Sequence, residues 1–182
     1  MSAFVLGGLE GVPAGERPGL LAAPVLDSLR SLGLLESVGV VEIDPAISDT
    51  AATQEAYGLQ PRALVNCVLV GGARDGDERV AACLVPSDRR ADVNGFVRRR
   101  LDVRKASFLP RERAVTASGM EFGGITAFGL PAGWPVLVAA EAVAEPLVVV
   151  GSGVRRSKLL VPGALLARIP GAEVADGIVR AQ

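Results

Sequence analysis

The chain has 182 residues, of which 49% are hydrophobic but only 4% aromatic, and its formal net charge is −1. These values predict one domain with a core of Val, Leu, Ala and Ile side chains, and they argue against a disordered chain. Histidine is absent, which excludes Ser-His-Asp and Cys-His catalysis, HExxH zinc sites and a histidine general base.

The N-terminal part contains a glycine- and proline-rich segment. Residues 1–19 hold seven glycines and prolines, so we expect a flexible lead-in or an edge segment ahead of a domain over residues 20–182. Three elements should follow in order: an amphipathic helix from Pro24 to Gly33, a strand over Ser37–Ile43, and a short helix that Ser48 or Asp49 caps and that ends before Gly58.

The middle of the chain predicts a hairpin and two helices. The β-rich runs Leu64–Gly71 and Arg79–Val85 flank a loop, Ala73–Glu78, whose Asp75-Gly76 pair is a turn signal. After Pro86 we expect a helix with an apolar face formed by Val93, Phe96, Val97 and Leu101, and with Arg98–Arg100 around its other side. Another short helix should begin at Pro110 and end at Gly119.

The last third predicts short strands around glycine-rich loops. Glu121–Leu130 has three glycines and no period, so we expect a loop there. The further elements are strands over Pro135–Ala139, Leu147–Val150 and Ser157–Val161, a helix that begins at Pro162, and a closing segment, Ala172–Asp176. Hairpins and helices alternate without regular βαβ units, which favours an α+β single domain with a curled mixed β-sheet flanked by short helices.

Positive charge is concentrated in two stretches. Between Arg89 and Arg113 nine basic residues face three acidic ones, a local net charge of +6, and Arg155, Arg156 and Lys158 form a second group. Clustered arginines can bind phosphates through bidentate contacts, whereas the simpler interpretation is a solvated helix face. Both interpretations stay open from charge alone.

Two glycine motifs could let the backbone approach a ligand. They are Gly123-Gly124-Ile-Thr-Ala-Phe-Gly129 and Gly151-Ser-Gly153, and each taken alone could be a tight turn. The second motif has Arg156 where a dinucleotide fingerprint requires its third glycine, and neither ends as a phosphate-binding P-loop does. We therefore expect no nucleotide cofactor.

The two cysteines and the hydropathy pattern indicate the cellular compartment of the protein. Cys67 and Cys83 lie in separate hydrophobic runs without CxxC spacing, which favours buried reduced thiols and leaves no usual zinc site. No run approaches the roughly 18–20 apolar residues of a membrane span, and the N-terminal stretch has no basic region typical of a secretory signal. We expect a cytoplasmic protein with no membrane partner.

Three motifs follow one another in the second half of the chain: Arg104-Lys-Ala-Ser-Phe108, Thr116-Ala-Ser-Gly-Met-Glu-Phe-Gly-Gly-Ile-Thr-Ala-Phe-Gly129, and Val150-Gly-Ser-Gly153 with Ser157-Lys-Leu159. In this order they resemble the YbaK/EbsC family of prolyl-tRNA-editing and related aminoacyl-tRNA deacylases. The resemblance covers roughly residues 20–178 and is strongest over 63–160. It implies an editing domain that hydrolyses the ester of a mischarged tRNA with a positioned water, without a covalent side-chain nucleophile. Such chemistry agrees with the missing histidines.

The resemblance also implies a set of site residues. The family's lysine in an early strand corresponds to Asn66 in Leu64-Val-Asn-Cys-Val-Leu69, and Lys105 could supply the missing ammonium; we expect these two residues in the catalytic site. The residues expected to bind substrate are Gly123, Gly124, Ile125, Thr126, Ala127 (at the family's proline position), Gly151, Ser152, Gly153 and Lys158. Those expected to bind tRNA are Arg98, Arg99, Arg100, Arg104, Arg155 and Arg156.

Three functions remain open at this point. The first is trans-editing, the deacylation of a mischarged aminoacyl-tRNA. The second, motivated by the neutral Asn66, is a module with the editing fold that binds the aminoacyl-tRNA 3′ end or a synthetase partner without turnover. The third is a small-molecule pocket unrelated to tRNA.

Overall fold

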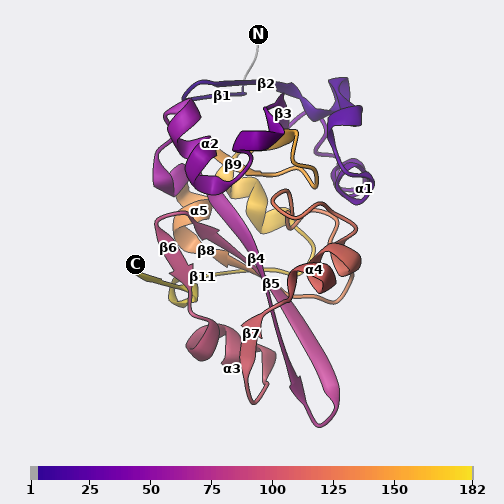
Figure 1. The fold of residues 1–182 in the computed structure, drawn as a ribbon, viewed down its shortest axis with the longest axis vertical. Helices are drawn as coiled ribbons and strands as arrows, with labels where there is room; N and C mark the ends of the chain where they lie inside the picture. Colours follow the sequence, from indigo (N-terminus) through magenta and orange to yellow (C-terminus); the bar gives the residue numbers. More distant parts are fainter. Residues whose placement is uncertain (1–3, 182) are drawn as a thin grey trace.

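The structure is a computed structural model that describes residues 4–181. It is a single α+β domain built on a curled mixed β-sheet with short helices around it, as predicted (Figure 1). One five-stranded sheet has the spatial order β1 (Phe4–Leu6), β2 (Leu9–Pro13), β3 (Gly39–Glu42), β10 (Ser157–Val161) and β9 (Val148–Gly151). The other has the order β11 (Ala172–Ala175), β8 (Val136–Ala139), β5 (Asp77–Pro86), β4 (Val65–Arg74) and β7 (Ala106–Phe108).

The two sheets meet where β4 begins. Leu64, directly before β4, forms a parallel bridge with Val149 on β9, so the strands continue from one sheet into the other. Strand β8 pairs in parallel with β5 and β11, whereas the other pairs are antiparallel. A small third sheet joins β12 (Val179–Ala181) to β6 (Arg89–Ala91). The sheet is therefore mixed and bends around its inner face.

The helices are short and lie at the ends and sides of the sheets. They are α1 (Ala23–Ser31), α2 (Thr50–Tyr57), α3 (Arg98–Leu101), α4 (Arg111–Ser118) and α5 (Ala140–Ala144). Short 3-10 helices cover Ala14–Glu16, Pro18–Leu20, Pro45–Ile47, Pro61–Ala63, Gly163–Arg168 and Asp176–Ile178. Within the described residues no helix is both long and apolar enough to cross a bilayer.

The predicted helix ends follow from local chemistry. The Asp49 side chain accepts a hydrogen bond from the Ala52 amide and caps α2. Gly58 and Gly119 end α2 and α4 in the left-handed conformation, with φ of +61° and +67°. These ends lie where the sequence predicts them.

The hairpin of β4 and β5 is longer than predicted. Residues 73 and 74 pair with 78 and 77, so the loop expected over 73–78 shrinks to a two-residue turn at Asp75 and Gly76. Both turn residues have positive φ, which is the geometry of a type I′ turn. The hairpin projects well beyond the rest of the sheet in Figure 1.

The prediction of a single helix after Pro86 is wrong for the first half of that segment. Residues 89–91 form strand β6, a turn of π-helix covers Val93–Val97, and only Arg98–Leu101 is α-helical. The Asp92 carboxylate accepts hydrogen bonds from the Gly95 and Phe96 amides, so the helical segment begins after Asp92. The helix predicted from Pro162 is a 3-10 helix, Gly163–Arg168.

The glycine-rich N-terminal segment packs as an edge hairpin. Strand β2 pairs with β1 on one side and with β3 on the other. Gly39 on β3 leaves room for the Phe4 ring, because a Cβ at position 39 would lie 2.4 Å from Phe4 Cγ. Residues 4–14 thus close one edge of the first sheet, and the Ala14 side chain is fully buried.

Candidate functional site

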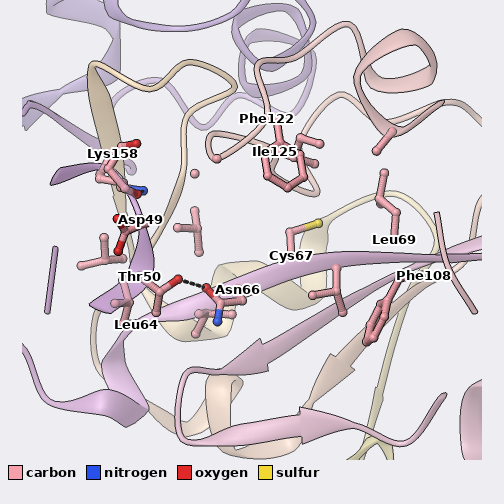
Figure 2. Close-up of a pocket in the computed structure, with 18 of the residues that line it drawn as sticks. Asp49, Thr50, Leu64, Asn66, Cys67, Leu69, Phe108, Phe122, Ile125 and Lys158 are labelled. Carbon is pink, nitrogen blue, oxygen red and sulfur yellow. Dashed lines mark hydrogen bonds between the residues drawn. The ribbon is translucent and has the colours of Figure 1, made fainter. Parts of the chain in front are cut away.

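A pocket of about 460 Å³ lies where the two sheets meet. Its floor is the first half of β4, and its walls come from the start of α2, from β9 and β10, and from the loop after α4. Figure 2 shows polar side chains gathered at one end and apolar ones at the other. A pocket of this size can hold an amino acid or a single nucleoside.

Asn66 and Thr50 form one side of the polar end. The Thr50 hydroxyl donates a hydrogen bond of 2.7 Å to Asn66 Oδ1, and this bond is drawn in Figure 2. With its oxygen held by Thr50, Asn66 keeps its amide N–H groups as donors for a ligand. Asn66 brings no charge to this position.

Lys158 forms the other side of the polar end. Its side chain lies on β10 with only 7% of the residue exposed, and Nζ donates a 2.7 Å hydrogen bond to the Ser48 carbonyl oxygen. Burial lowers the pKa of Lys158 to about 8, with a further contribution from Arg155, while the negative charge of Asp49 acts in the opposite direction. This lysine is an ammonium group in an environment that disfavours charge.

Ser48 and Asp49 place the start of α2 against the pocket. The Ser48 hydroxyl is buried and has no hydrogen-bond partner among the described residues. Asp49 also lines the pocket, although its carboxylate is used to cap α2. An unpartnered buried hydroxyl is unusual in a folded protein, and here it leaves a donor and acceptor beside Lys158.

The opposite end of the pocket is apolar and open. Leu69, Cys67 and Ile125 line it, and Phe108 and Phe122 stand at its edge with 60% and 46% of their surface exposed. The Arg111 guanidinium lies 4.7 Å from the centre of the Phe122 ring. The mouth therefore combines aromatic faces with a cation, which suits a flat base or an apolar side chain.

Cys67 is a thiol and not a thiolate. Burial raises the pKa of Cys67 well above its ordinary value, and the neighbouring Cys83 adds to the effect. A thiol that holds its proton is a weak nucleophile. Cys67 therefore contributes an apolar surface to the pocket.

The two glycine motifs pack against each other behind the pocket. A Cβ on Gly151 would lie 2.4 Å from the Gly124 carbonyl oxygen, and one on Gly124 would lie 2.6 Å from the Val154 carbonyl oxygen. The Gly153 amide donates a 2.7 Å hydrogen bond to that same Gly124 oxygen. Glycine is required here so that two backbone segments can touch.

The structure brings together only part of the predicted substrate site. Asn66, Gly123, Ile125, Gly151 and Lys158 line the pocket. The other expected residues lie behind its wall: Gly124, Thr126, Ala127, Ser152 and Gly153. The Ser152 hydroxyl, for example, lies 2.7 Å from the buried Ser157 hydroxyl, within the connection between β9 and β10.

Lys105 lies outside the pocket. It is exposed, directly before β7, and is absent from the residues that line the cavity. The pocket also extends beyond the segment 104–160 that carries the glycine motifs, because α2 and β4 supply half of the polar end.

The predicted arginines divide into two groups. Arg155 lies beside Gly123 and donates hydrogen bonds to the carbonyl oxygens of Phe122 and Pro45, and the Arg156 guanidinium donates to the Gly19 carbonyl oxygen. The other group is remote: α3, which carries Arg98, Arg99 and Arg100, lies at the far end of the molecule from α2 (Figure 1). Arg100 pairs with Glu173 and Arg104 with Asp75.

Several lining residues were not predicted as site residues. They are Ser48, Asp49, Thr50, Cys67, Leu69, Phe108, Arg111 and Phe122. The cap before α2 was visible in the sequence, but nothing local shows that this cap faces β4 and β10.

The chain was compared with known families and structures. The sequence model of the aminoacyl-tRNA editing domain matches residues 44–169. A comparison with curated protein sequences finds no significant match.

Among solved structures, a protein described as a candidate trans-editing enzyme for prolyl tRNA synthetase superposes with a TM-score of 0.72 at 20% identity, over 88% of this chain and 97% of that one. The hypothetical protein APE2540 superposes with a TM-score of 0.73 at 19% identity, over 86% and 99%. A scaffold protein from an epitope-grafting design study reaches 0.73 at 20% identity, over 88% and 97%. At these identities the likeness concerns the fold.

Proposed function

Because this chain belongs to the aminoacyl-tRNA editing domain family, we propose that it hydrolyses the ester bond of a mischarged aminoacyl-tRNA. The observation that carries the proposal is the two-ended pocket. Its polar end offers donors to an ester carbonyl, and its apolar end offers a surface for the attached side chain or the terminal base. The family match and the pocket chemistry thus support one substrate class.

The nucleophile in this proposal is a water molecule. The described pocket residues include a protonated thiol but no histidine, so attack by a positioned water is the simplest route. The water oxygen bonds to the carbonyl carbon, the ester C–O bond breaks, and the ribose oxygen leaves as a hydroxyl with the proton that the water releases. Asn66 and the exposed backbone near Gly123 and Gly151 orient the ester and the terminal ribose.

Cations around the mouth hold the phosphates of the tRNA end. Arg111 and Arg155 are close enough to the pocket to contact the 3′-terminal nucleotides. The remote arginines, Arg98, Arg99, Arg100 and Arg104, would contact the acceptor stem farther from the ester, as would Arg156. Electrostatic contacts of this kind also suit an encounter with a synthetase that carries the tRNA.

The test is a deacylation screen on several tRNAs mischarged with Ala, Cys or Ser. We expect the purified protein to release at least one of these amino acids faster than buffer does. Asn66→Ala should lower that rate by about 10- to 100-fold, because it removes an oriented donor at the ester. Asn94→Ala is the matched control, since Asn94 is the only other asparagine and lies exposed on the π-helical turn.

The lack of charge at Asn66 supports a second candidate function, which is tRNA binding without hydrolysis. A module that binds an aminoacyl-tRNA end without turnover would show salt-sensitive tRNA binding, with log K falling linearly in log salt, and no hydrolysis of any substrate in the screen. That combined result would replace the hydrolase proposal with the binding one.

A further inference from the structure

We propose that Lys158 supplies the positive charge that stabilises the oxyanion during ester hydrolysis, in place of a cation at position 66. This inference rests on the proposed hydrolase function and assigns its catalytic charge. Among the described residues that line the pocket, Lys158 and Arg111 are the cations, and Arg111 lies over Phe122 at the open apolar end. Lys158 is therefore the cation of the polar end, where the ester would lie.

The burial of Lys158 calls for an explanation. Moving an ammonium group out of water is costly unless it is paired. The described residues give it a hydrogen bond to a neutral carbonyl oxygen, and they show no ion pair between Lys158 and Asp49, the acidic group whose charge acts on it. The protein thus compensates the positive charge of Lys158 only in part. A ligand that develops negative charge would supply the rest of the compensation.

The geometry around Lys158 suits a carbonyl oxygen. An ammonium group has three donors, and one of them is used by the Ser48 carbonyl oxygen. The Ser48 hydroxyl is itself buried and has no partner among the described residues, so the two remaining donors of Lys158 are the ones open to a ligand. The two free donors of Lys158 on one side, and the Asn66 amide on the other, would surround an ester oxygen.

Such an arrangement acts most strongly in the transition state. The ester carbonyl is neutral in the ground state and becomes an oxyanion when water attacks it. In a site with little water the attraction between ammonium and oxyanion is large, and the donors are already in position. Lys158 would therefore raise the hydrolytic rate more than it raises substrate affinity.

Because this role requires a protonated Lys158, the rate of hydrolysis should depend on pH. The charged groups that face Lys158 are Arg155, from the loop after β9, and Asp49, at the start of α2. Burial and Arg155 outweigh Asp49, and the pKa of Lys158 falls to about 8. The enzymatic rate, after subtraction of the base-catalysed background, should decline as pH rises through about 8.

The decisive experiment measures single-turnover deacylation of an accepted mischarged tRNA from pH 6 to 9.5. The proteins are the wild type, Lys158→Met and Lys105→Met, which removes the only other lysine. We expect Lys158→Met to lose at least 100-fold in rate at pH 7 and to lose the decline near pH 8, while Lys105→Met retains that decline.

Binding and folding are measured on the same samples. Acceptor-end affinity that changes less than about fivefold in Lys158→Met would place its effect on the chemical step, and a cooperative thermal transition would show that it folds. Full activity of Lys158→Met with an unchanged pH profile would overturn the inference while leaving the hydrolase function intact. A wild-type protein that hydrolyses no substrate would overturn the proposed function instead.

Discussion

At the scale of single residues, Lys158 combines a cost in stability with a proposed gain in function. Its ammonium group is buried, and its pKa is lowered mainly by desolvation. A catalytic group held at the expense of stability is a common compromise in enzymes. The balance between the two can be measured in one variant.

Lys158→Met should stabilise the protein while it inactivates it. Methionine keeps most of the length of the side chain and removes the buried charge, so the free energy of unfolding at pH 7 should rise by about 1–3 kcal/mol. The stabilisation should shrink as pH rises from about 8 to about 10, because the folded wild type releases the Lys158 proton while the unfolded chain keeps it. Urea unfolding of both proteins at pH 7 and pH 9.5 measures this difference. A destabilised variant at pH 7 would mean that the bond to Ser48 outweighs the desolvation.

Thr50 is a positioning residue for Asn66. Its hydroxyl donates to Asn66 Oδ1 at 2.7 Å and so orients the amide. In Thr50→Val this orientation is lost, and we expect the single-turnover rate to fall about 10-fold with little change in tRNA affinity. Thr116→Val is the matched control on the exposed side of α4. In a double variant with Asn66→Ala the two losses should not add, because both act through the same amide.

At the scale of elements, the two glycine motifs bring two backbone segments into contact. Gly124 and Gly151 let the loop after α4 and the end of β9 pack backbone to backbone. This contact fixes the wall from which Gly123 and Gly151 reach the pocket.

A methyl group at Gly151 should disturb that contact. In Gly151→Ala the new Cβ would meet the Gly124 carbonyl oxygen at 2.4 Å, so we expect a loss of about 1–3 kcal/mol in unfolding free energy and a lower deacylation rate. In Gly19→Ala the Cβ meets nothing within 4 Å, and the change should stay within about 0.5 kcal/mol. Thermal unfolding of the two variants beside the wild type provides the comparison. Equal stability of Gly151→Ala and the wild type would show that the two loops can separate.

Most elements could be predicted because their signals are local. The Asp75-Gly76 turn, the Asp49 cap and the glycines that end α2 and α4 act within a few residues. Strand β7 and helix α5 had no such signal, since each is short and depends on its neighbours: β7 pairs with β4. The π-helical turn at Val93–Val97 was not predicted from the spacing of apolar residues. Its start depends on the Asp92 carboxylate, which accepts hydrogen bonds from the Gly95 and Phe96 amides.

At the scale of the whole molecule, charge is distributed unevenly around a nearly neutral chain. Net charge is −1, yet Arg111 lines the mouth of the pocket and Arg155 donates a hydrogen bond to the loop that borders it. Many of the remaining arginines are engaged in surface ion pairs, such as Arg100 with Glu173, and such pairs contribute little stability. For binding of the tRNA end, the position of a cation relative to the pocket should therefore be more important than the total charge of the chain.

Removal of a cation at the mouth should weaken binding of the tRNA end. In Arg111→Gln we expect lower affinity for a deacylated acceptor-stem RNA and a salt slope smaller by about 1, because one phosphate contact is lost. Arg30→Gln is the control, since Arg30 lies on α1 and pairs with Asp27. Fluorescence anisotropy over a range of salt concentrations measures both quantities. An unchanged slope for Arg111→Gln would place the bound RNA elsewhere on the surface.

The sequence by itself determined the chemistry that this protein can use and the kind of fold it adopts. The absence of histidine, the aliphatic composition, the turn and cap residues and the ordered glycine motifs all act locally or through composition. Only the tertiary structure decided which of these residues meet. Ser48 and Lys158 are 110 positions apart, yet one hydrogen bond joins them at the polar end of the pocket. Lys105, beside the recognisable motif, lies outside it. Local patterns carry the preference of a segment for helix, strand or turn, but a pocket wall is made by packing between distant segments, and packing is a property of the folded chain as a whole.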